Sequence, residues 1–169
     1  MRWGMSDRQI TELRLDTTNR QALALVLSYD ERMDVARMLL RAEQESLRLE
    51  FIYSCFGRDL LEFADSLKNL HASLEGEAVL DLLRVKIAIR AVDPSRGRLG
   101  VEVRLMQEFT GDPSAIAHRT IILDGFEIEQ TYVPGIVREI RQFISESGIS
   151  TDYPQIVDAK NESQRQEQS

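Results

Sequence analysis

The feature that most constrains the fold of this chain is a period-two alternation of aliphatic and polar side chains on both sides of one turn. Over residues 84–91 Val and Ile alternate with Arg, Lys and Ala, and a similar alternation returns over 99–106. The intervening Asp-Pro-Ser-Arg-Gly at 93–97 has the residues that favour a turn. Because successive side chains of a strand point to opposite faces, each strand has one aliphatic row and one polar row. The segment therefore predicts an antiparallel hairpin that another layer of structure must cover.

Other segments also predict strands. Residues 10–16 and 22–28 have strand composition on either side of a polar turn at 17–20, and the larger residues of the second segment share one face. Residues 47–54 place Leu, Leu, Phe and Tyr on one face, in alternation with Arg, Glu, Ile and Ser. This pattern is typical of a half-buried strand.

Residues 33–42 allow two interpretations. Four of their apolar residues fall at the i, i+3, i+4 and i+7 spacing of a helical stripe. The same residues could instead form a strand that leads through a turn at 43–46 into the strand at 47–54. On periodicity alone the helix is favoured.

Two segments change to helical periodicity. Over 58–73 Leu, Phe and Ala side chains form one apolar stripe, and Gly76 stands just past its end. Pro134 suits the first turn of a second helix, whose apolar stripe continues until the chain reaches Gly148. Each helix therefore has one face to bury.

The remaining segments complete the expected architecture. Residues 110–117 contain Gly, Asp, Pro and Ser and predict a loop, and residues 119–130 return to strand character. Together the segments predict an α+β fold in which a curved antiparallel sheet of about seven strands packs against two helices. We expect 8–149 to form a single domain and the polar residues 150–169 to be a disordered C-terminal tail.

Composition restricts the class of partner. The 169 residues carry a formal net charge of -7, which argues against a nucleic-acid binder or a protein that docks on anionic membranes, because both need a cationic surplus. No stretch approaches the ~20 apolar residues of a spanning helix, and the N-terminal residues lack an apolar signal segment. The one cysteine permits no internal disulfide. We therefore expect a cytoplasmic protein.

The residues that could carry chemistry are few and scattered. His71 lies beside the apolar stripe of the first predicted helix, His118 stands at the start of a predicted strand, and Cys55 ends another. Metal sites need three or four ligands at fixed spacings, and no such spacing occurs. Glu127 and Glu129 share a strand face, which is more typical of a solvated surface than of a catalytic pair. The sequence thus predicts no enzyme, no cofactor and no metal.

Charge is distributed unevenly along the chain. Residues 43–83 are strongly acidic, whereas the hairpin that follows is basic. One interpretation is that neighbouring strands neutralise one another through cross-strand pairs such as Arg90 with Glu102. The other is an acidic surface for a basic protein partner, centred on the first helix and the residues after it. The carboxylates of this candidate binding surface, called the acidic set below, are Glu62, Asp65, Glu75, Glu77 and Asp81.

The order of these segments resembles the WapI-like immunity proteins of bacterial polymorphic toxin systems. The resemblance runs over about residues 37–144 and is carried by the following segments: Arg37–Glu43 leading into Leu47–Phe51, the helix Asp59–Leu67 with its L..F...L pattern, the strands RVKIAIRA and GVEVRL, and the closing helix VREIRQFI. The resemblance implies that 33–42 is a strand, and we adopt that interpretation.

The resemblance also implies a function. Such proteins have no catalytic site and act by blocking a toxin domain, so we expect a non-catalytic protein-binding module. The alternative is a small-ligand-binding or enzymatic domain with a pocket between helix and sheet, lined by His71, His118 or Cys55. A subunit of a larger assembly is a third possibility. A concave pocket lined by these polar residues would favour the ligand-binding or enzymatic domain over the protein-binding module.

Overall fold

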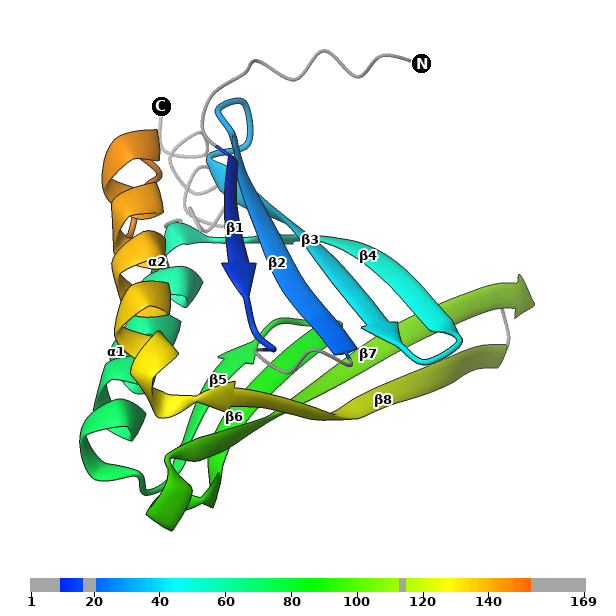
Figure 1. Ribbon diagram of the computed structural model, residues 1–169. Coiled ribbons are helices and arrows are strands. Elements are labelled where there is room, and N and C mark those ends of the chain that lie inside the picture. The colour runs from blue at the N-terminus through cyan, green and yellow to red at the C-terminus, as the bar shows by residue number, and fades with distance from the viewer. Residues whose placement is uncertain (1–9, 17–20, 113–114, 153–169) are drawn as a thin grey trace, which may run out of the picture.

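The structure is a computed structural model that describes residues 10–16, 21–112 and 115–152, with side chains described except over 107–118 (Figure 1). The described residues form eight strands and two α-helices, and the strands make two antiparallel sheets of four. The α+β class predicted from the sequence is confirmed. The single sheet of about seven strands is wrong, because the strands divide into two sheets.

The first sheet is a meander of consecutive neighbours: β1 (Ile10–Arg14), β2 (Gln21–Asp30), β3 (Val35–Gln44) and β4 (Leu47–Cys55). The segment at 33–42 is therefore a strand, and its helical spacing is overridden by pairing along the full length of β2. Alternate residues of β2 and β3 are buried, which is the pattern of a sheet with one covered face.

The second sheet repeats this order with β5 (Glu77–Asp81), β6 (Val85–Asp93), β7 (Arg98–Asp112) and β8 (Ala115–Glu129). The hairpin predicted around 93–97 is present, with its turn closed by Gly97 in the left-handed region. The predicted loop at 110–117 is wrong, because β7 and β8 stay paired as far as Asp112 and Ala115. Strand β5 was not predicted from the sequence.

Both helices form where the apolar stripes predicted them. Helix α1 (Gly57–Ser73) buries Leu60, Phe63, Leu67 and Leu70, and α2 (Val133–Ser147) buries Ile136, Ile140 and Phe143 along one face. The Asp59 carboxylate accepts the Phe56 N–H at 2.9 Å and so satisfies one free donor at the start of α1. Gly148 ends α2 in the left-handed region.

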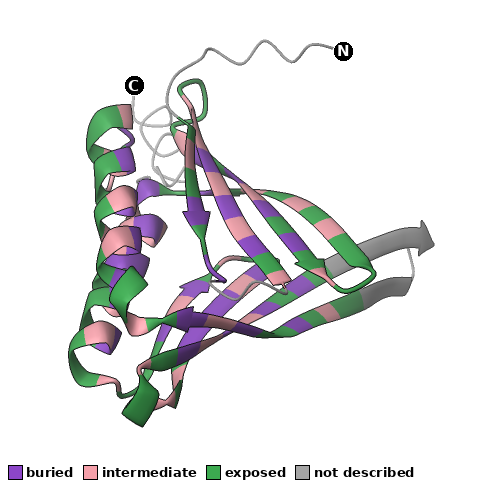
Figure 2. Cartoon of the chain, viewed as in Figure 1, coloured by how far each residue is buried: buried purple, intermediate pink, exposed green. Residues whose placement is uncertain are grey.

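The two helices lie together and close one hydrophobic core. Helix α1 packs against α2 and β5, and α2 lies beside β1, so each helix contacts the first strand of the opposite sheet (Figure 1). Buried bands on both helices and both sheets belong to one cluster (Figure 2). The chain thus uses the order of four strands and a helix twice, although the sequence shows no repeat.

The end of the described chain is fastened to the fold. Ile149 is buried, and the Ser150 carbonyl lies against Gly57 in a contact that leaves no room for a β-carbon. The Ser150 N–H also donates to Asp34 at 3.2 Å. The predicted disordered tail lies outside the described residues from 153 onward.

A matched pair of leucines tests the core. Leu67 is fully buried on α1, whereas Leu83 in the turn between β5 and β6 is 88% exposed. We expect Leu67→Ala to lower the free energy of unfolding by about 2–5 kcal/mol, because it leaves a cavity in the shared core. Leu83→Ala should change it by less than ~0.5 kcal/mol. Urea denaturation measures both, and equal effects would contradict the packing of α1.

Candidate functional site

Two of the residues that could carry chemistry, Cys55 and His71, lie at opposite ends of one helix. Cys55 ends β4 before α1, and His71 lies near the other end of that helix. The helix rises about 20 Å between Gly57 and His71, at 1.5 Å per residue. His71 is half-buried, and its carbonyl accepts a 2.9 Å hydrogen bond from the Gln130 side chain. His118 falls where side chains are not described.

Cys55 has the environment of a structural thiol. Its side chain is 2% exposed, and burial, with a smaller contribution from the nearby Asp59 carboxylate, raises the pKa of the thiol to about 12. A raised pKa keeps the thiol neutral, whereas a nucleophilic cysteine needs its pKa lowered. Among the described residues no three His, Cys, Asp or Glu side chains are grouped so as to hold a metal ion.

Much of the acidic set is paired within the fold. Glu62 forms an ion pair with Arg58, one helical turn away, at 2.7 Å. Asp65 forms an ion pair with Arg141 of α2, and Asp81 lies 3.7 Å from the Lys86 ammonium group. These three carboxylates therefore face cations of the same chain, and they offer a basic partner less charge than the sequence predicted.

Glu75 and Glu77 complete the acidic set. Both are exposed where α1 gives way to β5, and within the described chain neither carboxylate has an ion pair. The two residues are the part of the acidic set best placed to contact another protein.

The predicted cross-strand neutralisation in the second sheet is confirmed. Arg90 lies 3.5 Å from Glu102, and Arg104 lies 2.6 Å from the same carboxylate. Glu127 lies 3.7 Å from Arg98, so this carboxylate also faces a cation of the sheet. The outer face of the second sheet therefore neutralises its own charges.

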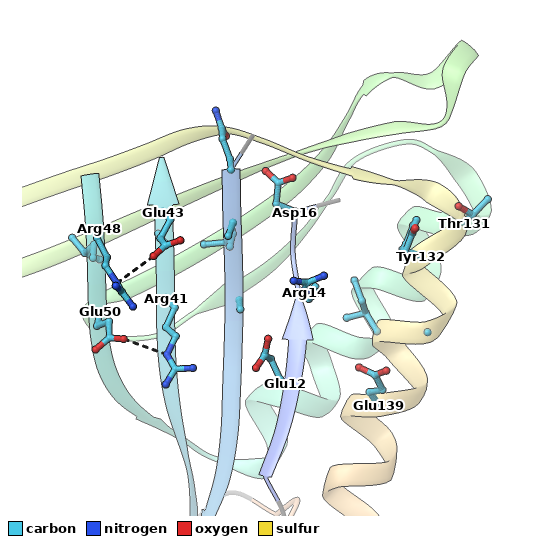
Figure 3. Close-up of a pocket in the computed structure, with 18 of the residues that line it drawn as sticks. Glu12, Arg14, Asp16, Arg41, Glu43, Arg48, Glu50, Thr131, Tyr132 and Glu139 are labelled. Atoms are coloured by element: carbon cyan, nitrogen blue, oxygen red, sulfur yellow. Dashed lines mark ion pairs between the residues drawn. The ribbon is translucent and has the colours of Figure 1, made fainter. Parts of the chain in front are cut away.

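A hollow of about 930 Å³ lies between the outer face of the first sheet and the start of α2 (Figure 3). The outer face is the one turned away from the core. The side chains that line the hollow come from β1 to β4 and from Thr131 through Glu139. Most of the charged residues around it are exposed, so the hollow opens to solvent. Neither His71 nor Cys55 lines it.

Two ion pairs form one wall of the hollow. Arg41 on β3 bonds Glu50 at 3.3 Å, and Arg48 on β4 bonds Glu43 at 3.2 Å (Figure 3). Each pair joins residues directly opposite in the β3–β4 ladder. Because all four side chains are exposed, the pairs add little stability and instead define the polarity of the surface.

The opposite wall carries charges that the described chain leaves unpaired. Glu12 and Arg14 project from β1, and Arg138 and Glu139 lie on α2, and none of the four has an ion pair with another described residue. These side chains offer both signs of charge to a bound molecule.

Apolar side chains cross the outer face next to the hollow. Val26, Leu39 and Ile52 are cross-strand neighbours on β2, β3 and β4. Val26 and Leu39 are partly exposed, and Ile52 is 73% exposed. These three residues are called the apolar row below. An exposed apolar row rimmed by charges is typical of an interaction surface.

A pocket between helix and sheet was one alternative from the sequence, but none of the residues that line this hollow or form the apolar row was predicted, although one signal was available. Ile52 stands in the strand at 47–54 where the alternation calls for a polar residue. The hollow itself could not be predicted, because its walls come from four strands and a helix whose arrangement depends on tertiary packing. Small outward residues such as Ala22 and Ala24 line the hollow, which becomes evident only once the arrangement of the sheet is known.

Comparison with known proteins adds little. No family model matches the sequence, and no curated protein matches it. Among solved structures, a chain from crystal structures of Trypanosoma brucei MRP1/MRP2 is similar, with 8% identity and a TM-score of 0.44 over 81% of this chain and 84% of that chain. No described helix is long and apolar enough to cross a bilayer.

The reactivity of Cys55 tests the structural interpretation. The pKa rises from 9.0 to about 12, so at pH 8 the folded protein should hold about 1000-fold less thiolate than the unfolded chain. The stability contributed by the neutral thiol is complete below pH 9 and is lost as the pH rises toward 12. Alkylation by iodoacetamide, followed by mass spectrometry, should be slow in buffer and fast in urea. Equal rates would contradict the burial.

Proposed function

We propose that this chain is a non-catalytic protein-binding module of the cytoplasm that binds its partner on the outer face of the first sheet. The observation that carries the proposal is the combination of the apolar row with the unpaired charges of the adjoining hollow. Apolar side chains at the centre supply affinity, and charges at the rim select the partner and its orientation.

The balance of charge favours a protein as the partner. The hollow is lined by four arginines and five carboxylates, listed here: Arg14, Arg41, Arg48 and Arg138, and Glu12, Asp16, Glu43, Glu50 and Glu139. A nucleic acid needs a cationic surplus, which this face lacks. A protein surface can match charges of both signs together with an apolar row.

A small ligand is a weaker candidate. The volume of about 930 Å³ lies in the range of ligand pockets. Such pockets are mostly enclosed by apolar side chains, whereas this one is lined by exposed charged residues. The hollow lies between helix and sheet, where the alternative placed a ligand or catalytic pocket. That alternative expected His71, His118 or Cys55 in the lining, and neither His71 nor Cys55 lines the hollow.

The resemblance to WapI-like immunity proteins supports a toxin domain as the partner. An immunity protein needs affinity and specificity but no chemistry of its own, so blocking requires only a complementary surface. The proposed role is therefore to cover the toxin domain and keep it inactive in the producing cell.

A coexpression experiment tests the role. A toxin domain encoded beside this chain should arrest growth when it is produced alone, and coproduction of the chain should restore growth. The purified pair should form a stable complex. Growth arrest that persists in the presence of folded chain, with no complex on gel filtration, would refute the immunity role.

Ile52→Arg tests the binding surface. Because Ile52 is 73% exposed, the substitution should leave the fold intact, and it places a charge in the apolar row. We expect binding of the partner to weaken by on the order of 2 kcal/mol or more, about thirtyfold in dissociation constant. Leu83→Arg is the matched control in the turn between β5 and β6, where the side chain is 88% exposed. Equal effects of the two variants in calorimetry would locate recognition elsewhere.

The acidic set is the second candidate surface, because Glu75 and Glu77 are free to contact a basic partner. Glu75→Lys together with Glu77→Lys reverses both charges without breaking an ion pair of the described chain. If the acidic set steers the partner, association in low salt should slow on the order of tenfold or more, and added salt should remove the difference. An unchanged association rate would leave the outer face of the first sheet as the binding surface.

A further inference from the structure

The edges of the two sheets differ in how they are protected. An edge strand exposes unpaired backbone N–H and C=O groups, and natural proteins shield such edges by shortness, bulges or a covering element. Strand β1 has five residues and lies beside α2, and β5 has five residues and packs against α1. The ladder of β8 is interrupted opposite Val101 and Val103, where Gly125 has a φ of 83°.

Within the described residues, strand β4 has none of these protections. Its nine residues contain no Gly, Pro or Lys, and its ladder to β3 runs without a register shift. In the described chain β3 is the one strand paired with it. The face of β4 that is turned toward the core carries Leu49 and Phe51, which are half-buried, and Leu47, which is 44% exposed. A long, regular and apolar edge of this kind is suited to pairing with another strand.

The charges of β4 indicate which strand. We propose that β4 pairs antiparallel with β4 of a second copy, about a twofold axis at Leu49. In this register Arg48 lies opposite Glu50 of the second copy, and Glu50 lies opposite its Arg48. Leu47 lies opposite Phe51, so the exposed apolar residues on the inner face become covered. Centring the pair on Glu50 would oppose two carboxylates, and centring it on Phe51 would leave Arg48 opposite Ser54.

The ion pairs already present extend this complementarity. Arg41 with Glu50 and Arg48 with Glu43 occupy neighbouring rows of the outer face. Across the twofold axis the row that holds Arg41 and Glu50 continues into Arg48 and Glu43 of the second copy. Positive and negative charges therefore alternate along the four side chains of this row, and the twofold symmetry generates a second row with the same composition. Edge pairing leaves the outer face exposed, so the dimer does not depend on the proposed partner binding.

Two charge variants test the pairing and its register. In a dimer of Arg48→Glu two carboxylates face each other at both contacts across the axis, and in a dimer of Glu50→Arg two guanidinium groups do so. Each variant alone should therefore dimerise on the order of tenfold more weakly than the wild type. When the two variants are mixed, a heterodimer has two contacts across the axis. At one contact the introduced Glu at position 48 lies opposite the introduced Arg at position 50. At the other contact the native Arg48 lies opposite the native Glu50. The mixture should therefore recover a dimer that contains one copy of each.

Light scattering and native mass spectrometry measure the mass of the full chain in solution. The control is Arg32→Glu, which reverses a charge away from the β4 edge, in the turn between β2 and β3. At about 100 µM, a concentration that populates any dimer with a micromolar dissociation constant, the wild type and Arg32→Glu should have twice the 19.4 kDa mass of one chain. The proposal is overturned if the wild type is monomeric, or if Arg48→Glu dimerises as well as the wild type. It is also overturned if the mixed variants form no heterodimer.

Discussion

The structure depends on burying two aliphatic sheet faces in one core, which helices α1 and α2 close together. A single antiparallel sheet of four strands leaves an apolar face that one helix cannot cover alone. In this chain the two helices cover both apolar faces together. Each helix follows one sheet and also packs against the first strand of the other sheet. Fully buried Phe63 and Phe143 on the paired helices belong to the same cluster as Leu25 and Ile87 on the two sheets. Neither half of the chain could bury its apolar face without the other.

This shared core determines which surfaces remain for function. With both inner faces buried, the outer faces of the sheets are left to solvent, and they differ in character. The second sheet neutralises its own charges around Glu102. The first sheet instead presents the apolar row beside a hollow whose charges on β1 and α2 are unpaired within the described chain. That difference, rather than net charge, is why we place the proposed binding on the first sheet.

Local pattern predicted most of the elements and little of their arrangement. Alternation and apolar stripes predicted six of the strands and both helices, because these periods are set by backbone geometry. The segment at 33–42 needed the resemblance, since its spacing fits a helix as well as a strand. Strand β5 was missed because its sequence, Glu-Ala-Val-Leu-Asp, has three consecutive apolar residues and no alternation of apolar and polar side chains. The division into two sheets and the ion pair between Asp65 and Arg141 depend on contacts distant in sequence, and local patterns cannot show these.

Methyl NMR of the complex with the protein partner is the most direct measurement of where this chain binds. Val26, Leu39 and Ile52 report on the outer face of the first sheet, and Leu83, Val92 and Ile122 are exposed methyl-bearing residues elsewhere. We expect the methyl resonances of the apolar row to shift on binding while those of Leu83, Val92 and Ile122 stay in place. Shifts confined to the second group, with the apolar row unchanged, would contradict binding on the first sheet.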